Sequence, residues 1–405
     1  MKVYYFISQR IRSGLKGSFS SLVSQIAVAI IALGMVISIL SYSILEGFKR
    51  EIVDKIYGLS GHIVVTKFDL NRSFEESPFN KNRDIYLFKD SLLGIKSVEP
   101  IIHKPGLLKS DQEVVGIILK GVEPDYNWEL FSKNNIIGRL PSFNDSAYSQ
   151  EIMVSKKIAN ALNTKVDDTI LLCFVQDKPR FRKVKITGLY ETGLEEFDEH
   201  VIMGDARLIR RLYNMPDSLV GSYEITLEHA EDLDSMALLV EETIDYDLGY
   251  LTVKDKYLQI FDWLMLLDRN VLIFLVLIIG VGTFVMVATL LIMIMERTSM
   301  VGLLKALGAR NAQIRRIFML NGAYIVFKGL FIGNVIGLLL CWLQWQFKLM
   351  PLDPDTYYMS SVPIAWTWIP FVLLNILFGT LLMLIQLIPV IMVSQINPAQ
   401  SVKFN

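Results

Sequence analysis

Long apolar runs that carry almost no charge constrain this chain more than any other feature. Leu22–Leu45 and Val271–Met295 contain no charged residue, Ile317–Phe347 is interrupted only by Lys328, and Ile364–Val393 is again free of charge. Each run is longer than the roughly 20 apolar residues that a helix needs to cross a bilayer. The sequence therefore predicts an α-helical membrane protein with four transmembrane helices.

Four basic residues precede the first run: Lys2, Arg10, Arg12 and Lys16. A signal peptide has the same order of features, but its apolar core is shorter and ends in a small-residue cleavage site. We therefore interpret the run as an uncleaved anchor. Its N-terminus is expected in the cytoplasm, because positively charged flanks are retained on that side.

Residues 47–268, between the first and second runs, are far more polar and are numerous enough to form their own core. A strand–helix–strand pattern occurs at both ends of this region. The elements are strand 61–66, helix 85–95 and strand 98–102 at the start, then strand 222–228, helix 232–242 and strand 250–254 at the end. Short strands and a hairpin at Phe174–Arg182 lie between them, which predicts a large α+β domain.

The first transmembrane helix is expected to continue beyond the membrane. Ile44, Phe48, Ile52 and Ile56 recur every four residues through a charged segment. This spacing indicates a helical stalk, and a frayed polar helix end is the alternative. Tyr257–Leu267, which is apolar and aromatic, would be the second stalk.

The distribution of basic residues predicts the orientation, with both termini in the cytoplasm. The short outer loop carries only Lys348, whereas the segments assigned to the cytoplasm carry Lys2, Arg10, Arg12, Lys16, Arg297, Lys305, Arg310, Arg315, Arg316 and Lys403. The predicted organisation is N-terminus and first span 1–46, periplasmic α+β domain with stalk helices 47–268, second span 269–295, cytoplasmic coupling loop 296–316, third span 317–347, short periplasmic loop 348–363, fourth span 364–393 and cytoplasmic tail 394–405.

The loop between the second and third runs has the most specific pattern. Residues 296–309 read ERTSMVGLLKALGA, and Leu303, Leu304 and Leu307 recur at helical spacing. We expect a short amphipathic helix at the membrane surface. Gly308 stands where a helix C-terminus favours a residue that tolerates positive φ. A basic loop that merely obeys the positive-inside rule is the alternative.

This loop, followed by QIRRIF, resembles the coupling segment of the FtsX-like permease family, the membrane subunits of type VII (MacB-like) ABC transporters. Met300-Val301 departs from the Glu-Ile that is usual there. The segments GIILKGVEP (116–124) and EIMVSKKIANALNTKVDD (151–168) and the INPA ending (396–399) are similar to the lipoprotein-releasing type, LolC and LolE. The resemblance implies docking of a separate ATPase through Glu296, Arg297, Gly302, Leu304, Lys305, Gly308 and Ala309.

The resemblance also implies partners and cofactors. An ABC ATPase subunit similar to LolD would hold ATP and magnesium, and this chain would hold no cofactor or metal. A second permease copy or a paralogue would complete the complex, and the substrate would be a lipoprotein or another membrane-derived molecule. Recruitment of a periplasmic carrier stays open, because the hairpin at Phe174–Arg182 is short.

The outer ends of the first two spans are the expected place for substrate. Their apolar residues Ile44, Phe48, Ile52, Phe261, Leu264 and Leu267 would contact acyl chains. Packing between the two stalks is the alternative role of these side chains. A different alternative concerns the whole protein, which would export another substrate or relay a signal to a periplasmic cell-wall hydrolase.

Motifs for chemistry in this chain itself are absent from the sequence. There is no GxxxxGK[ST] phosphate loop, the four histidines are scattered, and no basic bias indicates nucleic acid. The acidic segment Glu195–His200 is interpreted as a solvated loop. Lys328 is an intramembrane charge, which either extends to lipid phosphates or faces a subunit contact with polar groups such as Asn321 and Asn334.

Overall fold

The computed structural model describes residues 19–68, 76–89, 92–110, 113–129, 131–133, 135–143, 148–174, 179–353, 357 and 359–393. The predictions for the N-terminal basic residues, the C-terminal tail and the tip of the hairpin at Phe174–Arg182 lie outside these residues. The chain divides into two compact units. The helical unit comprises Met1–Lys49, Leu264–Pro351 and Ser361–Asn405, and the sheet unit comprises Arg50–Trp263 and Leu352–Ser360.

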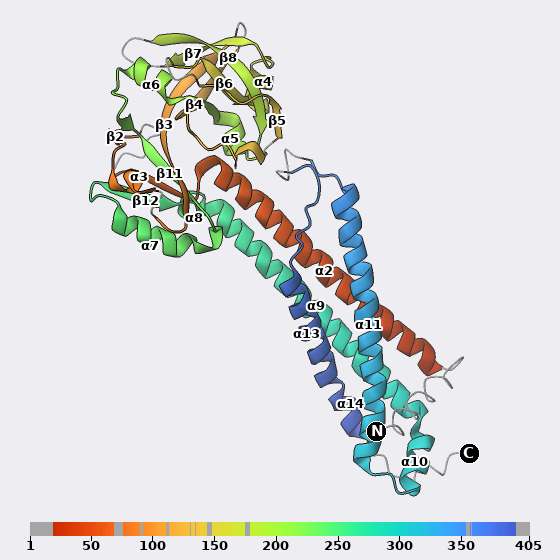
Figure 1. The fold of residues 1–405 in the computed structure, drawn as a ribbon. Coiled ribbons are helices and arrows are strands. Elements are labelled where there is room, and N and C mark those ends of the chain that lie inside the picture. Colours follow the sequence, from red (N-terminus) through yellow and green to blue (C-terminus); the bar gives the residue numbers. More distant parts are fainter. Residues whose placement is uncertain are drawn as a thin grey trace. The chain divides into compact units, whose positions relative to one another are not determined.

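Long apolar helices build the helical unit (Figure 1). They are α2 (Phe19–Ser60), α9 (Leu258–Glu296), α11 (Asn311–Phe347) and α13 (Trp368–Ile385), with the shorter α10 (Thr298–Ala306) and α14 (Leu387–Val393). Among the described residues, four segments are long and apolar enough to cross a membrane. The predicted fold class is confirmed. Because α2 continues without a break to Ser60, the frayed-end alternative is wrong.

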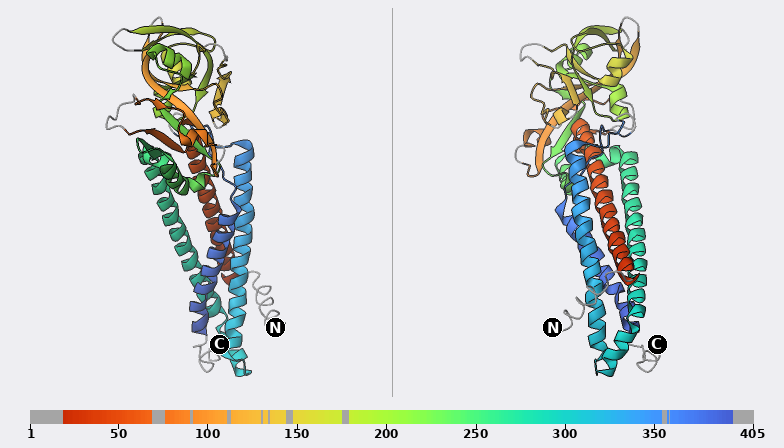
Figure 2. Two further views of the ribbon diagram at one scale, coloured as in Figure 1. Left: turned by 60° about the vertical axis from the view of Figure 1, so that its left-hand side comes forward. Right: turned by 90° about the vertical axis from the view of Figure 1, so that its right-hand side faces the viewer.

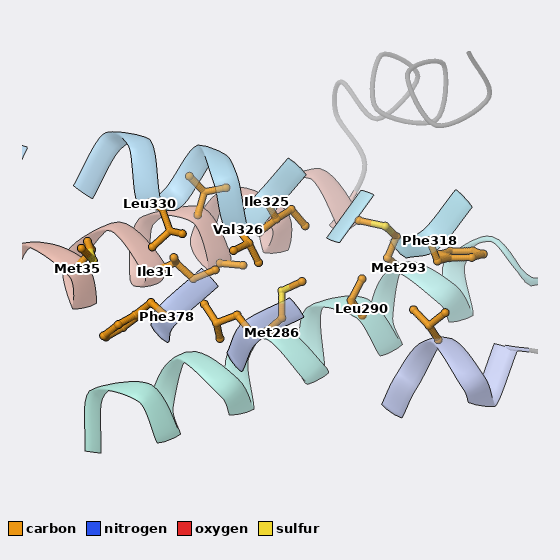
Figure 3. Packing of buried hydrophobic residues seen from close by; sticks show 14 of the residues in the cluster. Ile31, Met35, Met286, Leu290, Met293, Phe318, Ile325, Val326, Leu330 and Phe378 are labelled. Carbon is orange, nitrogen blue, oxygen red and sulfur yellow. The ribbon is translucent and has the colours of Figure 1, made fainter. Parts of the chain in front are cut away.

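Apolar side chains from α2, α9, α10, α11, α13 and α14 form the core of the helical unit (Figure 3). The labelled members of the cluster are Ile31 and Met35 of α2, Met286, Leu290 and Met293 of α9, Phe318, Ile325, Val326 and Leu330 of α11, and Phe378 of α13. These buried residues occupy only one side of each helix. The remaining surface exposes large apolar residues such as Phe284 and Phe331, as expected for helices whose solvent is lipid.

Glycines on α11 let its backbone approach α2 closely. A Cβ added at Gly333 would lie 2.7 Å from the Ala32 carbonyl oxygen, and one at Gly329 would lie 2.7 Å from the Ile31 side chain. Small residues at four-residue spacing are typical of tight contacts between membrane helices. Gly280 of α9, by contrast, has no heavy atom within 4 Å of such a Cβ, so it makes no close helix contact within this unit.

Strands that pair in both antiparallel and parallel directions form the sheet unit. Its strands are β1 (Ile63–Lys67), β3 (Ile95–Lys109), β4 (Val114–Val122), β5 (Asn135–Gly138), β6 (Glu151–Ser155), β7 (Thr169–Phe174), β8 (Arg180–Glu191), β9 (Val201–Asp205), β11 (Ser222–Leu227) and β12 (Leu248–Thr252), and β2 (Phe79–Asn80) pairs separately with β10 (Leu219–Val220). The order is β12-β1-β11-β3-β4-β9-β6-β8-β5. Because β7 pairs with both β3 and β8, six of these strands close into a ring (Figure 2).

Short helices cover the sheets: α3 (Asp84–Leu87), α4 (Lys156–Ala161), α5 (Glu195–His200), α6 (Ala206–Tyr213), α7 (Leu233–Thr243) and α8 (Val253–Lys256). The predicted hairpin is confirmed, since Phe174 pairs with Arg180. The predicted helix 85–95 is wrong: it ends at Leu87, Gly94 has φ +89°, and Ile95 begins β3. The segment Glu195–His200 forms α5, so its interpretation as a loop is also wrong.

Candidate functional site

The predicted coupling segment forms α10, between the end of α9 and the start of α11 (Figure 1). At its start, the Thr298 hydroxyl donates hydrogen bonds to the carbonyls of Ile294 (3.2 Å) and Met295 (2.7 Å). At its end, Gly308 has φ +88° and Ala309 N–H donates to the Leu304 carbonyl. No heavy atom crowds the Gly308 Cβ position, so this glycine serves the left-handed backbone turn, as predicted.

One face of α10 is buried and the opposite face is open. Val301 is fully buried in the same cluster as Ile314 and Phe318 of α11. Leu303 is 60% exposed and Leu307 is 77% exposed. A helix advances 100° per residue, so Leu303 lies almost opposite Val301. The helix therefore presents two leucines to the outside while a third apolar residue anchors it.

The structure does not place the seven predicted coupling residues on one surface. Glu296 and Gly308 are exposed, Arg297, Leu304, Lys305 and Ala309 are half-buried, and Gly302 is buried. The sequence pattern predicted Leu304 as a coupling residue. Leu303 and Leu307, which are the more exposed leucines of this segment, were not among the predicted residues. Fixing Val301 as the inward position would have given the correct helical phase.

The charge around α10 is strongly positive. Between residues 296 and 316, five basic residues (Arg297, Lys305, Arg310, Arg315 and Arg316) accompany one acid, Glu296, which gives a net charge of 5 − 1 = +4. The Arg310 N–H, at the start of α11, donates to the Gln313 side chain at 2.9 Å. An apolar patch with a basic surround suits a partner groove that is apolar at its centre and acidic at its rim.

The six predicted substrate-contacting residues differ in exposure. Ile44, Phe48, Phe261 and Leu267 are half-buried, whereas Ile52 is fully buried and Leu264 is 2% exposed. They also belong to different units, since Ile52 and Phe261 are in the sheet unit. Ile52 and Leu264 are buried in this conformation, and substrate contact by any of the six residues stays a prediction.

Two polar contacts fix the end of the helical unit that contains Ser43 and Lys49. The Lys49 ammonium pairs with the Asp268 carboxylate of α9 at 2.8 Å. The Ala365 N–H donates to the Ser43 carbonyl of α2 at 3.0 Å. A Cβ at Gly47 would lie 2.8 Å from the Pro363 carbonyl oxygen, so the segment before α13 covers one side of α2.

One pair of polar side chains within the helical unit is bonded reciprocally. The side-chain amides of Asn334 on α11 and Asn375 on α13 exchange two hydrogen bonds, of 2.6 and 2.9 Å. Asn334 therefore pairs with Asn375. Lys328 has an exposed side chain, and its ammonium lies 6.0 Å from the centre of the Tyr324 ring.

The segment Thr192–Asp198, which precedes and enters α5, has a structural role. The Asp198 carboxylate accepts hydrogen bonds from the Thr192 hydroxyl and from the Gly193 backbone N–H. Burial raises the pKa of Asp198, and these bonds oppose that rise. Phe197 contacts Tyr257, immediately before α9, with ring centres 5.6 Å apart. The motif thus joins the closed ring of strands to the start of α9.

Comparison with family models identifies the class of protein. A model described as MacB-like periplasmic core domain matches residues 24–243, and one described as FtsX-like permease C-terminal matches residues 272–398. The first alone covers more than half of the chain. The chain therefore belongs to the FtsX-like permease family with a MacB-like periplasmic domain, as the sequence resemblance predicted.

Individual relatives match along nearly the whole chain. The lipoprotein-releasing system transmembrane protein LolC of Neisseria meningitidis is 24% identical, over 82% of this chain and 80% of its own. LolE of Haemophilus influenzae is 23% identical, over 99% of both chains. Among solved structures, the periplasmic region of MacB from Actinobacillus actinomycetemcomitans matches at 15% identity over 52% of this chain and 97% of its own, with a TM-score of 0.36.

These findings define the general role of the chain. It is a multi-pass membrane protein with a periplasmic domain, and its relatives are permease subunits of ABC transporters.

Proposed function

We propose that this chain is the permease subunit of an ABC transporter that extracts lipoproteins from the outer leaflet of the inner membrane. A separate ATPase would bind ATP and magnesium and supply the energy. The observation that carries the proposal is the match to LolC and LolE, which includes the membrane helices as well as the periplasmic domain.

The energetics explain why such a task requires coupling to ATP. Each buried CH₂ group of an acyl chain contributes about 0.8 kcal/mol to membrane anchoring. Several long acyl chains together are held by on the order of tens of kcal/mol. Spontaneous escape is therefore negligible, and the permease must shelter the chains while they leave the bilayer.

In this proposal α10 is the docking element for the ATPase. Its exposed leucines, Leu303 and Leu307, would enter an apolar groove of the partner, and the surrounding basic residues would meet an acidic rim. Val301 ties α10 to the core of the helical unit. Movement of the partner would thereby be passed to α9 and α11.

The substrate would contact the outer parts of α2 and α9. Ile44, Phe48, Phe261 and Leu267 retain exposed surface and stay candidates for acyl-chain contacts. Ile52 and Leu264 would join them only after the helices around them move. A second permease, either a copy or a paralogue, would supply the opposite wall, and recruitment of a periplasmic carrier stays open.

The docking proposal is tested with Leu303→Asp in the complex with its ATPase. The side chain is exposed in this chain, so the variant should fold, but its charge would be desolvated in the partner groove at a cost of several kcal/mol. We expect ATPase stimulation and lipoprotein release to fall at least about tenfold. Leu238→Asp is the matched control, because Leu238 is also 60% exposed and lies on α7 of the sheet unit.

The cargo is tested by purifying the complex in mild detergent and identifying what accompanies it. Bound lipoprotein, together with its ATP-dependent release from proteoliposomes, supports the proposal. A bound cell-wall hydrolase with no lipoprotein would contradict it and favour the signal-relay alternative. Normal ATPase stimulation by Leu303→Asp would contradict the docking role of α10 without bearing on the cargo.

A further inference from the structure

A cavity of about 250 Å³ lies inside the sheet unit. It is smaller than the pockets that hold drug-sized ligands, which begin at about 300 Å³. Residues of β12, β1, β3, β4 and β9 line its floor, and its cover comes from the last turn of α2, α5, α8 and Tyr257.

Strand register places polar side chains in a row on the floor of the cavity. His103 of β3 is the direct cross-strand partner of Lys120 of β4, and Lys120 is in turn the partner of Met203 of β9. Directly opposed residues project from the same face of a sheet. His103 is held by Glu76, whose carboxylate lies 2.9 Å from the ring Nδ1.

Lys120 is the most deeply buried cation of the cavity, with 3% of its side chain exposed. Its ammonium donates to the Leu59 carbonyl at the end of α2 and to the Glu224 carboxylate, at 2.5 and 2.6 Å. An ammonium has three N–H donors, so one remains for a further acceptor. Burial lowers the pKa of Lys120 although Glu224 opposes this, and an additional anion would favour the charged form.

A second cation lines the cavity from α8. The Lys256 ammonium lies 5.5 Å from the centre of the Tyr257 ring. In the part of the chain that the structure describes, no acid lies within ion-pair distance of Lys256. Among the described residues that line the cavity, Glu76 is the one carboxylate, and it is already engaged with His103. Because Glu224 pairs with Lys120, Lys256 is the lining cation that is left without an acid partner among the described residues.

The remaining wall of the cavity is apolar. Val64, Ile118, Phe197 and Met203 contribute aliphatic and aromatic surface. A site with an apolar wall and a few convergent polar groups is typical of small-ligand binding. An inorganic anion would leave this wall in contact with water, whereas an anion that carries a short hydrocarbon would cover it.

We propose that this cavity binds a small organic acid with a short hydrocarbon tail, its carboxylate held by Lys120 and Lys256 and its tail against Val64, Ile118 and Phe197. The site is independent of the lipoprotein-release proposal. Its occupant would touch both the last turn of α2 and the residue before α9. Binding should therefore strengthen the attachment of these two helices to the sheet.

The experiment uses the full chain in nanodiscs with octanoate as the probe and octanol as its uncharged counterpart. Hydrogen exchange is followed in residues 57–66, 118–122 and 250–257. We expect octanoate to slow exchange in these segments in the wild type and in Lys254→Gln. Lys254 is a suitable control because it is an exposed neighbour paired with Asp234 and does not line the cavity.

Lys256→Gln should weaken the octanoate effect by about twofold to fivefold, the size expected for losing one solvent-accessible ion pair. Lys256 is exposed, so this variant should remain folded. Equal protection by octanol and octanoate would overturn the proposal, because no anion would then be recognised. An unchanged response in Lys256→Gln, or no protection by octanoate in the wild type, would overturn it as well.

Discussion

The helical and sheet units differ in which polar groups they bury. In the helical unit, large apolar side chains such as Phe331 are 71% exposed, and the reciprocal internal contact between helices is the neutral pair Asn334–Asn375. In the sheet unit the interior contains ions, and the Lys120–Glu224 pair is 3% and 5% exposed. The difference follows from the solvent, because lipid penalises an exposed charge, whereas a water-facing domain has hydrogen-bonding partners throughout.

A second difference is what holds elements together at close range. Helices α2 and α11 pack with their backbones close together, which the glycines of α11 permit. The strands of the sheet unit are instead joined by ladders of backbone hydrogen bonds. The helical unit should therefore be most sensitive to added volume. The sheet unit should be most sensitive to unpaired charge.

Gly333→Leu is expected to have the largest effect on stability. Even a Cβ at this position would lie 2.7 Å from the Ala32 carbonyl oxygen and from the Met35 Cβ, so α2 and α11 must separate. Overpacking of this kind costs about 3 kcal/mol. The measurement is thermal unfolding of the purified protein in detergent. Gly280→Leu is the control and should change stability by less than about 0.5 kcal/mol; equal effects would show that close approach is not what Gly333 provides.

His62 should make the sheet unit sensitive to acid. It is 5% exposed, stacks on Tyr57 with ring centres 4.0 Å apart, and burial lowers its pKa to about 4. An unfolded histidine titrates near 6.5, so between pH 6.5 and 4 only the unfolded state binds the proton. Stability therefore falls as pH drops through 6.5, and the loss, up to about 3 kcal/mol, is complete near pH 4.

The readout for His62 is hydrogen exchange in β1 and β11, which flank this residue, at pH values from 7 to 4. His62→Phe keeps an aromatic ring on Tyr57 but cannot titrate, so the protection of β1 and β11 from exchange should depend less on pH in this variant. The variant also loses the acceptor for the Leu227 N–H. His229→Gln, at an exposed position, should behave as wild type. An unchanged pH profile in His62→Phe would assign the acid sensitivity to other groups.

The sequence was sufficient for the elements that depend on local pattern. The charge-free runs located the membrane helices, and the position of Gly308 predicted its positive φ, which is +88°. It was insufficient where contacts are distant along the chain. Lys120 and Glu224 are 104 residues apart, and closure of the ring depends on β7 pairing with β3. Neither has a local signature.

The outward face of α10 shows a different limit of sequence reasoning. Leu303, Leu304 and Leu307 are equally apolar, so composition alone does not determine which of them faces the core. The phase is set by Val301, which is buried against α11, a contact between residues of two different helices. The end of the predicted helix 85–95 is wrong for a related reason, because Ile95 pairs with Leu227 of β11, a residue distant along the chain.

The Asn334–Asn375 pair should contribute moderately to the helical unit. Hydrogen bonds between membrane helices contribute about 0.6 kcal/mol on average and up to about 1.7. We expect Asn334→Leu and Asn375→Leu each to lower the unfolding temperature. The double variant should cost less than the sum of the two, with a coupling of about 1 kcal/mol. Strict additivity would show that the two amides do not stabilise each other.

Lys328 is expected to have the smallest effect, although it is a charge within a membrane helix. Its ammonium is directed toward the Tyr324 ring, one turn nearer the helix start that carries Arg315 and Arg316. Asn334, named above as a polar partner for Lys328, is bonded to Asn375 instead. Both observations favour extension of the side chain toward lipid phosphates. Lys328→Arg should then leave transport unchanged, and Lys328→Met should lower it mildly. A large loss of transport in Lys328→Arg, with the complex still assembled, would instead require a specific contact with a neighbouring subunit, since arginine keeps the charge but not the geometry of lysine.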